Sequence, residues 1–178
     1  MKESLHHLDR WLAAHDENWS ARLSVADERG VLRSIAIVVT RSGDAFPLLA
    51  LLAAIFLLSG PETRAHVLIF VLGDLFAFLA THLLKFAARR PRPEGDWGEF
   101  YRRTDPHSFP SGHSARGGVY AMTAVLLGPW WLAVSAALWG AAVAYSRVAM
   151  GVHYLSDAIV GFFTGMGMAL LIAAVILT

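Results

Sequence analysis

The sequence predicts an all-α membrane protein, a polytopic bundle of about five transmembrane helices preceded by an amphipathic helical segment. Of its 178 residues, 56% are hydrophobic and 16% are charged, and the mean hydropathy is +0.49, which is more apolar than a typical soluble protein. Apolar stretches of membrane-spanning length alternate with short breaks, and no Lys, Arg, Asp or Glu follows Asp157. A chain of this length is expected to form a single domain.

Residues 1–43 differ from the rest because charged residues interrupt every apolar stretch. Their apolar positions recur with a helical period, which predicts one or two amphipathic helices on the membrane surface, with Trp11 and Trp19 near the lipid headgroups. A helix packed on the membrane spans is the alternative. The uninterrupted apolar core of a cleavable signal peptide is absent, so we expect this segment to stay attached.

The transmembrane part is expected to cover residues 44–178. A helix crosses the hydrocarbon core with about 20 mostly apolar residues, or somewhat fewer when flanking groups snorkel. Five stretches fit this requirement: 44–59, 64–86, 111–127, 130–145 and 153–178. Gly-Pro pairs end the first and third stretches as helix breakers, and the proline-rich segment 87–110 is predicted to be a long loop.

Successive spans cross in opposite directions, so their connections alternate between the two faces. Residues 1–43, the loop 87–110 and the link 146–152 then share one face, together with nearly every Lys and Arg. Loop charge counting alone places this face in the cytoplasm. Cations that bind a substrate carry no information on topology, however, so the side depends on what these residues do.

Three short segments at span ends on the charged face carry the residues with chemistry. In the first, Lys85 is followed by Arg92, which lies between two prolines. Those prolines end the helix and fix the direction of Arg92, which suits a bidentate clamp for an oxyanion. Taken alone, such cations are more typical of interfacial side chains that snorkel to the headgroups, as we expect for Arg89 and Arg90.

The second segment, Pro110 to His113, predicts the start of a helix. Ser111 is the expected N-cap, and with Gly112 it leaves free backbone N–H groups at the positive end of the helix dipole, where an anion binds readily. His113 then lies in the first turn, beside any bound anion. Simple capping by Ser111 and an interfacial position for His113 are the structural alternatives.

The third segment joins Ser146 and Arg147 to His153 and Asp157. Because His153 and Asp157 are four residues apart at a helix start, they share a face, and the carboxylate can accept a hydrogen bond from one imidazole nitrogen. The other nitrogen is then left as a nucleophile or base. A purely structural His–Asp pair is the alternative.

Together these segments bring three cations, a helix N-terminus and two histidines to one face. That combination matches phosphoryl transfer, in which catalysis consists mostly of positioning and of stabilising charge on phosphate oxygens. Lys85, Arg92 and Arg147 can supply the positive charge that Mg²⁺ supplies elsewhere, so we expect neither a metal nor a cofactor. The chain has no cysteine, which excludes disulfides, thiolate metal sites and cysteine nucleophiles.

These motifs resemble the three-part signature of the type 2 phosphatidic acid phosphatases, the PAP2 superfamily, in order and at the expected internal spacings. The three parts are Lys85 with Arg92-Pro93, Pro110-Ser-Gly-His113, and Ser146-Arg147 with His153 and Asp157. The resemblance spans residues 85–157 and implies the helical membrane fold of that family, which the soluble vanadium haloperoxidases share. Many bacterial relatives have six spans, whereas five are expected here.

The resemblance also implies a role for each matching residue. His153 attacks phosphorus to form a phosphohistidine, and Asp157 orients His153 and supports its positive charge. His113 protonates the leaving oxygen and later deprotonates the attacking water. The remaining residues hold the phosphate oxygens: Lys85, Arg92, Ser111, Gly112 through its amide, and Arg147.

The expected function is hydrolysis of the phosphate monoester or diphosphate of a membrane lipid. Phosphatidic acid, phosphatidylglycerol phosphate, polyprenyl diphosphate and lipid A stay open as substrates, and the oligomeric state stays open as well. The expected partners are the bilayer and this lipid, with no nucleic acid. Bacterial members of the family usually act on the extracytoplasmic face, so we expect an inner-membrane protein with its site on that side. The alternatives are a vanadate-dependent haloperoxidase and a non-catalytic carrier of lipid phosphate or other anions.

Overall fold

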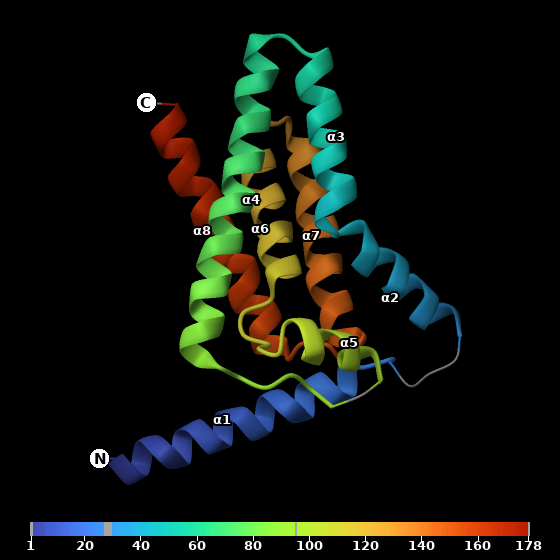
Figure 1. Ribbon diagram of the computed structural model, residues 1–178, viewed down its shortest axis with the longest axis vertical. Helices are drawn as coiled ribbons and strands as arrows, with labels where there is room; N and C mark the ends of the chain where they lie inside the picture. Colours follow the sequence, from blue (N-terminus) through green and yellow to red (C-terminus); the bar gives the residue numbers. More distant parts are fainter. Residues whose placement is uncertain (1, 27–29, 95, 178) are drawn as a thin grey trace.

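The computed structural model describes residues 2–26, 30–94 and 96–177, with the backbone alone for residues 2–12 and for positions 96, 98 and 100. Over this part the chain is predominantly helical, which confirms the predicted fold class (Figure 1). The helices are α1 (Lys2–Leu23), α2 (Val31–Ser42), α3 (Ala45–Leu58), α4 (Pro61–Ala88), α5 (Asp96–Thr104), α6 (Gly112–Leu127), α7 (Trp130–Ala149) and α8 (Leu155–Ile176).

Helices α4, α6, α7 and α8 form the body of the molecule, and α6 contacts the other three (Figure 1). Ser111 is the N-cap of α6, and its amide donates a hydrogen bond to the carbonyl oxygen of Asp157 at 2.9 Å. This bond ties the start of α6 to the start of α8. The end of α4, the starts of α6 and α8 and the end of α7 therefore lie together, so the three motif segments meet at one end of the bundle.

The close approach of α8 to α6 depends on two glycines of α8. A Cβ atom at Gly165 would collide with the carbonyl oxygen of Ala115, and one at Gly161 would collide with that of Ser111. A larger residue at either position would require the backbone to move. These glycines therefore set how near α8 lies to the beginning of α6, where two of the motif segments meet.

Three helices of the described chain, α4, α7 and α8, are long and apolar enough to cross a membrane. α2 and α3 meet at a bend of 48° and count as a fourth span when taken together. All five predicted transmembrane stretches form helices, but α3 has 14 residues and α6 has 16, fewer than the about 20 that cross the hydrocarbon core unaided. α6 instead packs against three longer helices.

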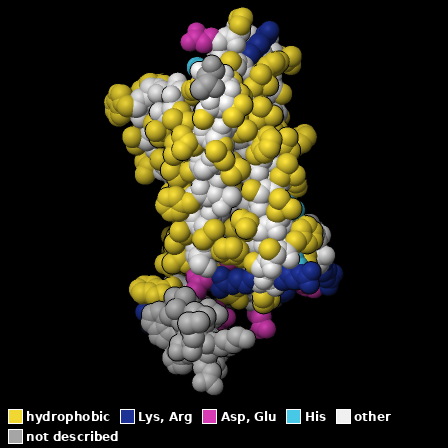
Figure 2. All heavy atoms as spheres, turned by 90° about the vertical axis from the view of Figure 1, so that its left-hand side faces the viewer, with side chains coloured by type: hydrophobic (Ala, Val, Ile, Leu, Met, Phe, Trp, Pro, Cys, Tyr) yellow, Lys and Arg dark blue, Asp and Glu magenta, His cyan; other side chains and the backbone are white. Residues whose placement is uncertain are grey.

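The outer surface has the distribution expected of a protein embedded in a bilayer. Figure 2 shows hydrophobic side chains along the length of the bundle, with Lys and Arg gathered towards the end where the motif segments meet. Large apolar side chains such as Leu83, Phe86 and Phe163 are 72%, 65% and 63% exposed. Lipid tails, unlike water, are a favourable environment for such a surface.

The amino-terminal helices differ in how they meet the bundle (Figure 1). α1 runs across the charged end, whereas α2 packs on α7, where the buried hydroxyls of Thr40 and Ser146 are 2.7 Å apart. α2 is therefore a helix packed on a membrane span, which is the alternative stated above for part of residues 1–43. Trp19 is 54% exposed, and the side chain of Trp11 lies outside the described residues.

Candidate active site

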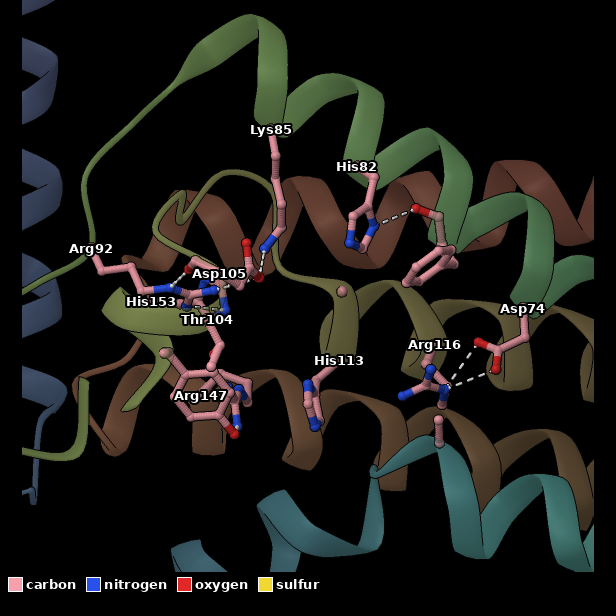
Figure 3. Close-up of a pocket in the computed structure, with 14 residues that line it drawn as sticks. Asp74, His82, Lys85, Arg92, Thr104, Asp105, His113, Arg116, Arg147 and His153 are labelled. Carbon is pink, nitrogen blue, oxygen red and sulfur yellow. Dashed lines mark hydrogen bonds and ion pairs between the residues drawn. The ribbon is translucent and has the colours of Figure 1, made fainter. Parts of the chain in front are cut away.

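A cavity of about 290 Å³ lies at the charged end of the bundle and is lined by residues of α3, α4, α5, α6 and α7 and of the loops beside them (Figure 3). Six of the eight predicted site residues line it: Lys85, Arg92, Gly112, His113, Arg147 and His153. The other two, Ser111 and Asp157, are fully buried and do not line the cavity. The sequence motifs therefore converge on one site.

His153 lies in the short link between α7 and α8 and is buried. Its ring Nε2 lies 3.0 Å from Nη1 of Arg92. A guanidinium only donates hydrogen bonds, so a neutral His153 carries its lone pair on Nε2 and its proton on Nδ1. Nδ1 faces Oδ2 of Asp157 at 3.5 Å. This is the orientation that a nucleophilic Nε2 requires.

Burial and nearby cations favour the neutral form of His153. Loss of solvent is the largest cause, followed by the positive charges of Arg92 and Arg147, and together they lower the pKa of His153 well below its usual value of 6.5. The ring therefore keeps a free lone pair at neutral pH.

Asp157 is held from two sides at the start of α8. Its Oδ2 accepts the Tyr154 amide at 2.9 Å, and its Oδ1 accepts Nη1 of Arg90 at 3.0 Å. Arg90 also donates to Asp16 of α1 at 2.7 Å and stacks over the Tyr154 ring, with 3.9 Å from Cζ to the ring centroid. The expectation that Arg90 is a surface contact is therefore wrong, because its guanidinium supports the carboxylate that faces His153.

The Asp105 carboxylate is hydrogen-bonded to two of the cations that are predicted to bind phosphate, Lys85 and Arg92. Its Oδ2 accepts hydrogen bonds from Nζ of Lys85 and, at 2.8 Å, from Nη2 of Arg92. Arg92 also donates Nε to the Asp105 carbonyl oxygen at 2.7 Å. Burial opposes ionisation of Asp105, but the hydrogen bond and charge of Lys85 and the charge of Arg92 outweigh it and lower the pKa of this carboxyl. Asp105 lies in the predicted loop 87–110 and belongs to none of the three motif segments, so its role was not predicted.

Arg147 is the third cation and has an unused donor. Its side chain is buried at the end of α7, its Nη1 lies 3.4 Å from the Tyr101 hydroxyl, and its Cζ lies 4.8 Å from the Tyr101 ring centroid. Within the described part of the chain, Nε of Arg147 has no hydrogen-bond partner. A buried donor without a partner is costly, and an anion in the cavity would satisfy it.

Tyr101 belongs to α5, a helix inside the segment predicted to be a loop. Its ring lies beside both Arg147 and Arg92, whose Cζ is 5.2 Å from the ring centroid. α5 therefore covers the cations with an aromatic side chain.

His113 lies in the first turn of α6 and has a carboxylate partner. Its Nε2 is 2.9 Å from Oδ1 of Asp44, the N-cap of α3. Beside it, the Ser111 hydroxyl accepts the amide of Ser114 at 3.4 Å, which is the capping contact that the sequence left as the alternative for Ser111. Asp44 was not predicted, because no sequence spacing connects it with His113.

The far end of the cavity holds another cation, Arg116, one turn along α6 from His113. Its Nε donates to both carboxylate oxygens of Asp74 at 3.0 and 2.9 Å, so this pair joins α4 to α6. Nδ1 of His82 lies 2.9 Å from the Phe78 carbonyl oxygen in its own helix. Arg116 was missed, although it is the only charged residue between positions 111 and 127.

The other arginines near the site do not line the cavity. Arg89 ends α4 and donates to the Phe86 carbonyl oxygen at 3.1 Å. Arg102 donates to the Pro93 carbonyl oxygen at 3.0 Å, and Arg103 pairs with Glu99 at 2.5 Å on the surface. Among the described residues, no three His, Asp or Glu side chains gather as a metal site would require.

The fold and the cavity together define an integral membrane protein with a buried cavity that is lined by cations. The sequence model of the PAP2 superfamily matches residues 66–178, and the chain belongs to that family.

Two relatives match somewhat more than half of this chain. The lipid A 1-phosphatase of Rhizobium johnstonii is 36% identical over 110 residues, which cover 57% of this chain and 44% of the relative. The undecaprenyl-diphosphatase of Sulfolobus acidocaldarius is 30% identical over 108 residues, which cover 58% of this chain and 52% of the relative. The alignments thus span about half the length of these relatives.

Two crystal structures have the same fold. Aquifex aeolicus LpxE superposes with a TM-score of 0.70 and 21% identity over 84% of this chain and 90% of its own. A transmembrane PAP2-type phosphatidylglycerolphosphate phosphatase from Bacillus subtilis superposes with a TM-score of 0.73 and 24% identity over 92% of this chain and 85% of its own. The predicted family fold is therefore confirmed.

Proposed function

We propose that this protein is an integral-membrane phosphatase that removes phosphate from a membrane lipid through a phosphohistidine, without a metal. The observation that carries the proposal is the orientation of His153. Its Nε2 lies 3.0 Å from Nη1 of Arg92, and its Nδ1 faces Asp157. A phosphate held by Arg92 is thereby presented to the His153 lone pair. A site that only binds an anion has no need of an oriented nucleophile.

Phosphate binding comes first. The phosphate oxygens replace the Asp105 carboxylate as acceptors of the hydrogen bonds from Lys85 and Arg92. They also accept a hydrogen bond from Nε of Arg147, which has no partner among the described residues. The Gly112 amide adds a donor at the start of α6, where the helix dipole favours an anion. These fixed donors stabilise the charge on the equatorial oxygens as the transition state forms.

Two chemical steps follow. In the first, the Nε2 lone pair of His153 attacks phosphorus, the bond from phosphorus to the lipid oxygen breaks, and His113 donates a proton to that oxygen. Asp157 stabilises the positively charged ring of the phosphohistidine through Nδ1–H. In the second, water gives a proton to His113 and attacks phosphorus, and the bond from phosphorus to nitrogen breaks. Inorganic phosphate and neutral His153 result.

The substrate is a lipid because the site lies at the end of an apolar bundle, where headgroups are found. Phosphatidic acid, phosphatidylglycerol phosphate and polyprenyl diphosphate carry the required group. The relatives named for lipid A and undecaprenyl diphosphate support lipid phosphates as the substrate class.

The proposed location is the inner membrane, with the active site on the extracytoplasmic face. Charge counting favours the opposite side, but it counts Lys85, Arg90, Arg92 and Arg147. All four are engaged in the site or in ion pairs beside it. These four residues therefore do not indicate on which side of the membrane the charged face lies.

Phosphate release from a panel of lipid phosphates, by purified protein in EDTA, tests the proposal. We expect release by the wild type and loss of release in His153→Ala, while His66→Ala near the start of α4 keeps the wild-type rate. Acid quenching during turnover is expected to trap an acid-labile phosphoprotein in the wild type alone. Full activity of His153→Ala would contradict the mechanism, and tight lipid binding without phosphate release would favour a carrier.

Sidedness needs a separate measurement. In sealed vesicles with the protein in one known orientation, water-soluble short-chain substrate added outside is hydrolysed only if the site faces outwards. Hydrolysis by right-side-out vesicles is the expected result, and hydrolysis by inside-out vesicles alone would contradict the proposed face.

A further inference from the structure

The cavity does not end at the predicted phosphate site. It continues past His113 to Arg116 and Asp74, with the cations around His153 at its other end (Figure 3). Arg116, paired with Asp74, is therefore a fourth cation in the lining of this cavity. The proposed hydrolysis of a single phosphate gives Arg116 no task.

Arg116 is held in a fixed direction. Its Nε donates to both oxygens of Asp74, and its Nη1 donates to the Gly43 carbonyl oxygen at 2.9 Å. The hydrogen bonds of Arg116 to described residues use Nε and Nη1 and leave out Nη2. In Figure 3 the guanidinium lies between Asp74 and His113. A donor is thus left for something other than the protein.

A buried ion pair is an expensive way to join two membrane helices. Asp74 is 7% exposed and lies 11 residues before Lys85 on α4, roughly 16 Å along the helix axis at about 1.5 Å per residue. Well-packed apolar residues often stabilise a structure as much as a buried ion pair does. An ionisable residue at this depth in a membrane protein is more typical of a substrate site.

The order of groups along the cavity matches the order of groups in a lipid diphosphate. The nucleophile His153 and its cations come first, the proposed proton donor His113 comes next, and Arg116 follows towards the apolar part of the bundle. In a lipid diphosphate the terminal phosphate, the bridging oxygen and the inner phosphate follow one another towards the hydrocarbon chain. A lipid monophosphate has no anionic group at the third position.

We propose that Arg116, oriented by Asp74, binds the inner phosphate, so the preferred substrate class is a lipid diphosphate. This inference rests on the proposed phosphatase function. His153 Nε2 attacks the terminal phosphorus, the bond from that phosphorus to the bridging oxygen breaks, and the electron pair stays on that oxygen. The proton from His113 neutralises the new charge there, and Arg116 holds the lipid monophosphate that leaves.

The test compares the diphosphate and the monophosphate of one polyprenol as substrates. The key variant is Asp74→Asn with Arg116→Gln, because an amide pair keeps a hydrogen bond between α4 and α6 and leaves no buried charge unpaired. For the diphosphate we expect kcat/KM to fall by about 100-fold, as for loss of one transition-state donor, with a change of at most about threefold for the monophosphate. Arg116→Lys is expected to recover part of the loss.

The control is Arg64→Gln. Arg64 lies at the other end of α4 and donates to the Phe56 carbonyl oxygen at 2.9 Å, so neither substrate should be affected. Equal losses on both substrates in the double variant would overturn the inference, since they indicate a structural role. A wild type that hydrolyses only the monophosphate overturns the inference and leaves the proposed function standing, whereas release from neither lipid overturns both.

Discussion

Oδ1 of Asp44 and Nε2 of His113 lie 2.9 Å apart and join the break between α2 and α3 to the first turn of α6. The contact gives His113 a carboxylate partner from a segment 69 residues away in sequence. His113 is the proposed proton donor, so its ring must keep a fixed orientation at the leaving oxygen. Asp44 is thus a positioning residue for that ring.

Replacing Asp44 with Asn is therefore expected to reduce kcat by about 10-fold, within the range that one proton-transfer group contributes, with little change in KM. Steady-state phosphate release measures both constants. Glu62→Gln, a carboxylate change at the start of α4, should leave both unchanged. A rise in KM with unaltered kcat would mean that Asp44 contributes to binding instead.

Asp105 competes with the substrate for Lys85 and Arg92, because its carboxylate accepts hydrogen bonds from both. Asp105→Asn keeps the size of the side chain and removes the competing charge. We expect KM and the inhibition constant for inorganic phosphate to fall by about three- to tenfold. The reason is that a neutral amide binds these cations more weakly than a carboxylate does, and phosphate displaces it more easily. Thermal unfolding should show a larger stabilisation by added phosphate in the variant than in the wild type.

The competition should not depend on pH between about 5 and 8. The lowered pKa of Asp105 keeps it ionised there, and its contribution is lost only as the pH falls through that lowered pKa. An Asp105→Asn protein with weaker phosphate inhibition than the wild type would show that Asp105 arranges the cations and does not compete.

Most of the predicted site residues line one cavity. Their convergence could be predicted because they lie at the ends of apolar stretches. Lys85, His113, Arg147 and His153 must share one end of any bundle in which successive spans alternate in direction. The predicted Asp157 also faces His153, since a separation of four residues is one helical turn.

The partners of these residues could not be predicted, because each comes from a distant segment. Asp44 reaches His113 across 69 residues, and Asp16 reaches Arg90 across 74. Only the packed helices bring them together, and no spacing in the sequence marks them. Arg116 is different, since a lone charge in an apolar helix indicates a functional group.

The pH profile should follow the lowered pKa of His153. The nucleophile is inactive when protonated, so a pKa well below 6.5 keeps it active in mildly acidic solution and moves the acid limb of kcat/KM below 6.5. Arg147→Gln removes one cause of the shift and should move that limb to higher pH, besides weakening phosphate binding. Measuring kcat/KM from pH 4 to 9 locates the acid limb in the wild type and in Arg147→Gln. An acid limb at or above 6.5 in the wild type would be inconsistent with a neutral buried His153.

The support of Asp157 by Arg90 can be tested against a neighbouring residue of the same type. Arg90→Gln removes the ion pairs with Asp157 and Asp16, whereas Arg89→Gln changes an exposed arginine whose side chain donates to a backbone carbonyl oxygen of its own helix. In Arg90→Gln the buried carboxylate keeps the Tyr154 amide but loses its cation.

Breaking a fully buried pair costs about 3–5 kcal/mol, and because the Arg90 side chain is partly exposed we expect a loss on the order of 2 kcal/mol. The freed carboxylate should also orient His153 less well, so kcat is expected to fall by about 10-fold, as for loss of a group that orients a catalytic histidine. Thermal unfolding and steady-state kinetics in one detergent check both effects. Equal behaviour of the two variants would show that Arg90 is an ordinary interfacial arginine after all.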